Sequence, residues 1–106
     1  MSGGRRRVTR IETTIDEERG VFMISVAAEL AHMHPQTLRM YEARGLIEPK
    51  RSPKNTRLYS QRDVELLQRI QQLTAEGLNL AGVQRVLALE RRLEELEARR
   101  RNADAT

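Results

Sequence analysis

Side chains that can read the edges of DNA bases are concentrated between residues 36 and 40. The amide of Gln36 can pair with adenine through two hydrogen bonds, and the guanidinium of Arg39 can pair with guanine. Each such pair contributes roughly 1–3 kcal/mol of discrimination between bases. Thr37 offers a hydroxyl to a phosphate and a methyl group to thymine, and Met40 lies beside them. These residue types predict a DNA-reading helix face, with an ordinary solvated face as the alternative.

More hydrogen-bond donors follow in a short segment rich in Arg, Lys and Asn. Arg51, Lys54, Asn55 and Arg57 would place several donors on a small hairpin, which suits contact with the DNA backbone or the minor groove. We expect Arg57 and Tyr59 to act together on a phosphate. A structural role for this pair is the alternative.

Two residues near the end of the predicted reading helix have two possible roles each. The Tyr41 hydroxyl could donate to a phosphate while its ring packs, or the residue could be purely structural. Arg44 suits interaction with the free carbonyl groups and the dipole at a helix C-terminus, and contact with a phosphate is its second possible role. The complete set of predicted DNA contacts is Gln36, Thr37, Arg39, Met40, Tyr41, Arg44, Arg51, Lys54, Asn55, Arg57 and Tyr59.

Other kinds of site lack the residues they need. The chain has no cysteine, so it offers no thiolate metal ligand and no thiol switch. His32 and His34 form a His-x-His pair, but His34 more simply caps the helix that begins at Pro35. Nothing resembles a catalytic nucleophile with its base, a P-loop or a dinucleotide-binding glycine pattern. We therefore expect no enzymatic activity, no metal and no cofactor.

Composition and charge favour a small helical protein that binds a polyanion. Its 106 residues suffice for one domain, and with only 3% aromatic residues the core must consist of aliphatic side chains. Residues 21–62 carry seven Lys or Arg against three acids, whereas residues 63–106 carry seven against eight. A basic middle segment suits phosphate contact, although ordinary solubility charge could also explain it. No signal peptide or membrane-spanning run is present, so we expect a cytoplasmic protein at the nucleoid.

Two short helices and a hairpin are predicted to position these side chains. Apolar spacing predicts a helix over residues 26–31 with Ser25 as its N-cap, and a second helix from Pro35 to about Arg44, closed by Gly45. Helices joined this closely are typical of a helix-turn-helix. Two short strands with a turn near residues 52–55 would form the wing, and residues 21–24 would be a brief strand or an entry segment.

Two further helices are predicted in the second half of the chain. Ser60 and Asp63 form a capping-box-like pair, and this helix would end at Gly77. Asn79 caps the last helix, which meets no breaker before about Arg101, and residues 89, 93, 96 and 100 follow the spacing of a coiled-coil seam. This seam is too short for a stable isolated coiled coil, so we expect the last helices of two copies to form an antiparallel pair braced against the domain. The alternative is that this helix packs only on its own domain. The predicted dimerisation residues are Val86, Leu87, Leu89, Leu93 and Leu96.

The predicted fold class is mainly α: a winged helix-turn-helix domain with a β-hairpin wing and a C-terminal dimerisation helix in an antiparallel coiled coil. We divide the chain into a flexible N-terminal arm, in which Arg5 to Arg7 could also reach a minor groove, the DNA-binding domain, a linking helix, the dimerisation helix and a tail. Their predicted limits are 1–20, 21–77, 78–88, 89–101 and 102–106.

Three segments carry a resemblance to a known family. ISVAAELA at 24–31, MHPQTLRMYEARGLI at 33–47 and RLYSQRDV at 57–64 resemble the MerR family of transcription regulators in order and spacing. Within that family, HPQTLR at 34–39 and GLNLAGV at 77–83 are similar to the heat-shock repressor branch, HspR. Met40 departs from the polar or aromatic residue usual at its position.

This resemblance implies a sequence-specific repressor of heat-shock and chaperone genes. It also implies a homodimer on double-stranded DNA with an inverted-repeat (palindromic) operator, and the chaperone DnaK as a protein co-repressor. Three other readings stay open. They are a MerR-like regulator of other genes, an architectural or excisionase-like DNA binder, and an adaptor that binds proteins through its last helix.

Overall fold

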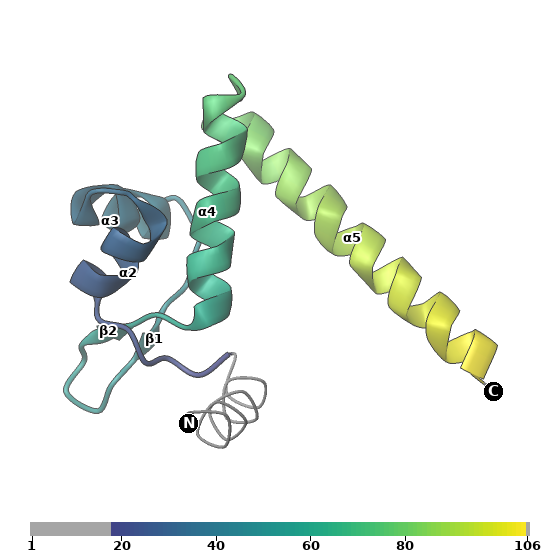
Figure 1. Cartoon of the computed structure of the whole chain (residues 1–106), viewed down its shortest axis with the longest axis horizontal. Coiled ribbons are helices and arrows are strands. Elements are labelled where there is room, and N and C mark those ends of the chain that lie inside the picture. The colour runs from purple at the N-terminus through teal and green to yellow at the C-terminus, as the bar shows by residue number, and fades with distance from the viewer. Residues whose placement is uncertain (1–17, 106) are drawn as a thin grey trace, which may run out of the picture. The chain divides into compact units, whose positions relative to one another are not determined.

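The computed structural model describes residues 18–105. The chain divides into two compact units, Met1–Arg69 and Ile70–Thr106. Residues 1–17, and with them most of the predicted arm, lie outside the described residues. In chain order the elements in Figure 1 are α2 (Ile24–Ala31), α3 (Pro35–Ala43), β1 (Lys50–Arg51), β2 (Arg57–Leu58), α4 (Gln61–Ala75) and α5 (Leu80–Ala105).

Helix α2 begins earlier than its sequence pattern predicts. Met23, not Ser25, occupies the N-cap and makes no side-chain capping bond, so the predicted serine cap is wrong. The Met23 carbonyl accepts from the N–H groups of Val26 and Ala27 at 3.0 and 2.9 Å. The helix starts early because Phe22 is held in an extended bridge to Tyr59, and the chain turns directly from that bridge into the first helical turn.

Helix α3 has the predicted ends. The Nδ1 atom of His34 accepts the Gln36 N–H at 3.0 Å, and Pro35 occupies the first turn, where no N–H is needed. At the other end Gly45 has a φ of 78°, a left-handed conformation that glycine adopts without strain. The Leu46 N–H then donates to the Tyr41 carbonyl at 2.9 Å, which closes the helix.

The wing is a very short antiparallel hairpin. Lys50 pairs with Leu58 and Arg51 pairs with Arg57, so each strand contributes only two residues. At its tip the Ser52 N–H donates to the Thr56 carbonyl at 2.9 Å, and the Ser52 carbonyl accepts from the Asn55 N–H at 2.8 Å. Asn55 has a φ of 66°, and asparagine tolerates this conformation better than most residues. The structure therefore confirms the predicted turn.

The segment before α2 lies along this hairpin. The N–H groups of Val21 and Phe22 donate to the Tyr59 carbonyl at 3.0 and 2.9 Å, and the Tyr59 N–H donates back to Phe22 at 2.7 Å. Lys50 Nζ donates to the Glu18 carbonyl at 2.8 Å. Glu18 also pairs with Arg62 at 3.2 Å. Residues 18–20, which we predicted to belong to a flexible arm, are thus bound to the wing and to α4.

The core of the first unit combines small and large apolar side chains. Helix α2 buries three alanines and packs on α3, because small side chains let two helices approach closely. Helix α4 starts with the predicted capping box: Ser60 Oγ accepts from the Asp63 N–H at 3.0 Å, and the Ser60 N–H donates to Asp63 at 2.9 Å. The buried apolar residues of this unit are Ala27, Ala28, Ala31, Leu38, Tyr41, Leu46, Ile47, Tyr59, Val64 and Leu67.

The second unit contains the end of α4 and the long helix α5 (Figure 1). Asn79 caps α5 as predicted, since its Oδ1 accepts from the Gly82 N–H at 2.9 Å. Val83 and Leu87 are buried, and the helix continues past Arg101 through Ala105, so the expected polar tail is helical to that point. Within residues 18–105 no helix is long and apolar enough to span a bilayer.

Candidate DNA-binding surface

One side of helix α3 carries most of the predicted base-reading residues. Gln36, Arg39 and Met40 are exposed and Thr37 is half-buried, whereas Leu38 lies in the core. This division follows from the helical period, because Leu38 lies on the opposite side of the helix from Gln36. The structure therefore presents these four side chains where a ligand can reach them.

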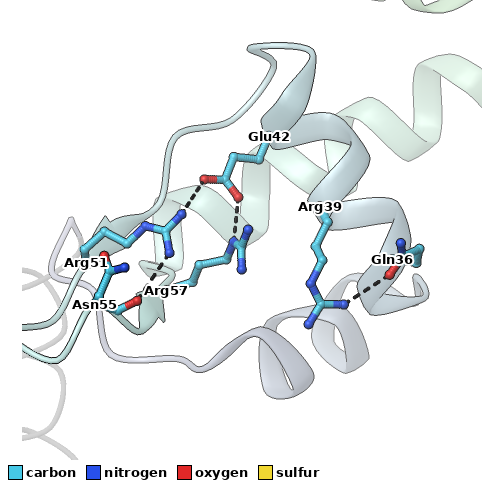
Figure 2. Close-up of polar contacts among 6 residues, drawn as sticks. All are labelled: Gln36, Arg39, Glu42, Arg51, Asn55 and Arg57. Carbon is cyan, nitrogen blue, oxygen red and sulfur yellow. Dashed lines mark hydrogen bonds and ion pairs between the residues drawn. The ribbon is translucent and has the colours of Figure 1, made fainter.

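Gln36 and Arg39 are not independent of each other. The Oε1 atom of Gln36 accepts from Arg39 NH1 at 3.2 Å, one turn along the helix (Figure 2). A two-bond pair between Gln36 and adenine needs this same oxygen as an acceptor. The side chains of Gln36 and Arg39 are thus already hydrogen-bonded to each other on the exposed face of α3.

The hairpin is tied to α3 by a carboxylate that we did not include among the functional residues. Glu42 Oε1 accepts from Arg57 Nε at 2.6 Å, and Glu42 Oε2 contacts Arg51 NH2 at 3.1 Å (Figure 2). The hydrogen bond to Glu42 raises the pKa of Arg57 above its usual value. The sequence signal for this role was weak: Glu42 is the one acid between Arg39 and Arg44, surrounded by cations.

The predicted wing residues project their polar groups at the hairpin tip. Arg51 NH1 donates to the Asn55 carbonyl at 3.3 Å, and Ser52 Oγ accepts from the N–H of Lys54 at 3.2 Å. Lys54 and Asn55 are exposed, and Arg57 is half-buried. Several donors therefore lie on a small, locally bonded loop.

Both predicted tyrosine contacts lie in the core. Tyr59 is completely buried, and its hydroxyl has no hydrogen-bond partner among the described residues. Burial, followed by the nearby negative charge of Glu42, raises the pKa of Tyr59. Tyr41 is 6% exposed, and burial raises its pKa too. A direct phosphate contact by the Tyr59 hydroxyl does not fit this placement, because the residue is completely buried.

Arg44 and the histidines occupy helix ends. Arg44 is the C-cap of α3, and its N–H donates to the Met40 carbonyl at 3.0 Å. His32 ends α2 with a left-handed φ of 58°, and His34 caps α3. Within residues 18–105 no three His, Cys, Asp or Glu side chains are grouped as metal ligands would be.

The predicted dimerisation residues fall into two groups. Leu87 is buried and Val86 is half-buried within a single copy of the chain. Leu89, Leu93 and Leu96 are 69%, 55% and 45% exposed, and they lie one helical turn apart on α5. These three leucines form an apolar stripe, which we call the α5 stripe.

This arrangement defines a winged helix-turn-helix DNA-binding protein. Two helices are joined by a tight turn, a basic hairpin lies beside the second helix, and that helix has an exposed polar face. Residues 22–90 match the family model described as MerR HTH family regulatory protein. The chain therefore belongs to this family of helix-turn-helix regulatory proteins.

Curated relatives agree with this assignment. The chain is 50% identical over 97 residues to a Streptomyces coelicolor protein assigned the name heat shock protein HspR, covering 91% of this chain and 62% of that protein. It is 36% identical over 69 residues to the HTH-type transcriptional regulator GlnR of Bacillus cereus, covering 65% of this chain and 54% of GlnR. The chain thus spans somewhat more than half the length of these relatives.

Solved structures share the fold. HiNmlR, a MerR family regulator lacking the sensor domain and bound to promoter DNA, aligns with a TM-score of 0.61 and 25% identity over 79% of this chain and 70% of its own. PbrR691 from Ralstonia metallidurans CH34, in complex with lead(II), aligns with a TM-score of 0.65 and 32% identity over 74% of this chain and 65% of its own. These alignments confirm the predicted mainly helical fold with a helix-turn-helix and a small hairpin, whereas pairing of the last helix in an antiparallel coiled coil stays a prediction.

Proposed function

We propose that this protein represses heat-shock and chaperone genes by binding an inverted-repeat operator as a homodimer. The observation that carries the proposal is the exposed polar face of α3 beside a hairpin with two arginines, Arg51 and Arg57. The choice of genes is supported by 50% identity to the HspR protein over 91% of this chain.

Each side chain of the surface has an assigned role in this proposal. The α3 face reads base edges in the major groove, with Arg39 as its main specific contact. Hairpin donors and Arg44 contact the sugar–phosphate backbone, which fixes the register of the protein without reading sequence. Tyr41 and Tyr59 support both elements from the core. The proposed direct contacts are Gln36, Thr37, Arg39, Met40, Arg44, Arg51, Lys54, Asn55 and Arg57.

The homodimer is proposed from the α5 stripe. One recognition helix and one wing bury little surface, and specific sites of this kind are read by two-fold symmetric proteins. Leu89, Leu93 and Leu96 provide an apolar surface that a second copy can cover in an antiparallel coiled coil. The protein co-repressor, the chaperone DnaK, is proposed from the HspR resemblance alone.

The proposal is tested by sequencing the genomic DNA fragments that the purified protein retains. We expect one inverted-repeat motif upstream of chaperone genes, bound more tightly than a scrambled duplex at equal salt. Arg39→Ala should relax the sequence preference, whereas Lys54→Ala at the exposed hairpin tip should weaken binding to operator and scrambled DNA alike. Retention of all fragments equally would favour an architectural DNA binder. Lack of DNA binding at low salt would favour the protein-binding adaptor.

A further inference from the structure

Glu42 on helix α3 binds both arginines of the wing, Arg51 and Arg57. We propose that Glu42 is a positioning residue for DNA reading: its carboxylate fixes the orientation of the hairpin relative to α3, so that base-reading and backbone-contacting side chains meet the duplex in a single arrangement. This inference rests on the proposed function, since it concerns how the operator is read.

The two arginines are the directly opposed residues of the hairpin. Arg51 and Arg57 are register partners on β1 and β2, and Glu42 gives one carboxylate oxygen to each, at 3.1 and 2.6 Å. Like charges directly opposite on neighbouring strands destabilise a hairpin. The carboxylate of Glu42 offsets this repulsion and ties both strands to α3 at the position where they pair.

A hairpin this short gains a defined orientation from such a contact. Each strand has two residues, and an isolated two-stranded hairpin is marginally stable in water. The Glu42 side chain is 23% exposed and that of Arg57 is 30% exposed, so this ion pair is partly shielded from solvent. Ion pairs between fully exposed side chains contribute little to stability. A shielded carboxylate that is bonded to two guanidinium groups holds them in a better defined geometry.

The contact also leaves donors available for DNA. Arg57 binds Glu42 through Nε, and among the described residues its two terminal nitrogens have no hydrogen-bond partner (Figure 2). A phosphate can bind there while the bond to Glu42 persists. Glu42 therefore orients the Arg57 guanidinium and leaves its two terminal nitrogens available to bind a phosphate.

An alternative role for Glu42 is purely electrostatic, because any acid near DNA repels phosphates. The matched control for this effect is Glu48, which is exposed, lies two residues before β1 and is not part of the Glu42 ion pairs. Glu42→Gln and Glu48→Gln each remove one negative charge from the same unit. Only the first variant removes a contact with the wing arginines.

The test compares the affinity of each variant for the captured operator and for a scrambled duplex at equal salt. We expect Glu48→Gln to strengthen binding to both duplexes equally. We expect Glu42→Gln to keep or raise affinity for scrambled DNA but to lower the operator-to-scrambled ratio about tenfold, or about 1.4 kcal/mol. In an Arg57→Gln background the same Glu42→Gln change should no longer lower the ratio.

Two measurements on the free protein separate positioning from folding. The Nε–H resonance of Arg57 should exchange slowly with water in the wild type and quickly in Glu42→Gln. The melting temperature of Glu42→Gln should stay close to that of Glu48→Gln.

The outcomes separate the two proposals. If the wild type prefers its operator and Glu42→Gln behaves like Glu48→Gln, the positioning role is overturned and the proposed function stands. If the wild type does not discriminate between the duplexes, the proposed function fails, and the reading role of Glu42 fails with it.

Discussion

Replacing Leu93 by glutamate should convert the proposed dimer into monomers. Leu93 is the central residue of the α5 stripe, and 55% of its side chain is exposed in a single copy. A glutamate there would place a charge at the centre of the proposed interface, where the same residue of the partner would add a second charge. Burying an unpaired carboxylate is strongly unfavourable.

The size of the effect follows from the exposed fractions of 69%, 55% and 45% for Leu89, Leu93 and Leu96. Complete burial of one leucine contributes about 1.5–3 kcal/mol, so the stripe offers roughly 5–10 kcal/mol to a dimer of two copies. Association costs on the order of 4–15 kcal/mol, a range that overlaps this gain, so the dimer depends on every leucine of the stripe. Loss of Leu93 from both copies removes about 2–3 kcal/mol, and with the added charge we expect dimerisation to weaken at least about hundredfold.

The assay is light scattering after size exclusion, at several protein concentrations, with circular dichroism to show that α5 stays helical. Ala88→Glu is the matched control, because Ala88 is exposed on α5 next to the stripe and this change adds the same charge. We expect a dimer for the wild type and Ala88→Glu and a monomer for Leu93→Glu. A dimer in all three proteins would place the interface elsewhere and refute the reasoning.

Two further predictions concern the stability of the first unit. Tyr59→Phe should raise the free energy of unfolding by about 1 kcal/mol at neutral pH, because it removes a buried hydroxyl without a partner. Burial raises the folded-state pKa of Tyr59, so the wild type should lose stability as pH rises above about 10, the ordinary tyrosine pKa. Denaturant titrations at pH 8 and 11 should show a smaller loss for Tyr59→Phe, and an equal loss would contradict the assignment. Ser60→Ala should lower the free energy of unfolding by about 1 kcal/mol, because it removes the hydroxyl that accepts from Asp63; an unchanged urea midpoint would show that this cap contributes nothing.

Local sequence signals were sufficient for most of the fold. His34-Pro35 at the start of α3, Gly45 at its end and Asn79 at the start of α5 each satisfy backbone groups within a few residues, so their roles could be read from the sequence. The exposed face of α3 followed from the helical period alone. In contrast, the start of α2 depends on a bridge to Tyr59, which lies far along the chain, and the serine pattern at residue 25 could not reveal it.

The site was harder to predict wherever partners are distant in sequence. Arg57 could be identified as a basic wing residue, but its bond to Glu42 crosses fifteen positions and joins two different elements. Tyr59 was predicted to act with Arg57 on a phosphate, which requires an accessible hydroxyl. Its complete burial reflects tertiary packing, which residue type alone does not determine.

The hairpin tip is closed by its own residues. Ser52 accepts from the N–H groups of Lys54 and Thr56 through its hydroxyl, and Arg51 bonds the Asn55 carbonyl, so the hydrogen bonds described at the tip join residues 51–56 to one another. Because these Ser52 bonds are local, we expect a change of loop length between Ser52 and Thr56 to leave the contacts of Arg51 and Arg57 with Glu42 in place. The length of this tip is therefore a property that can be changed by mutation, to alter how far the hairpin extends, without refolding the rest of the domain.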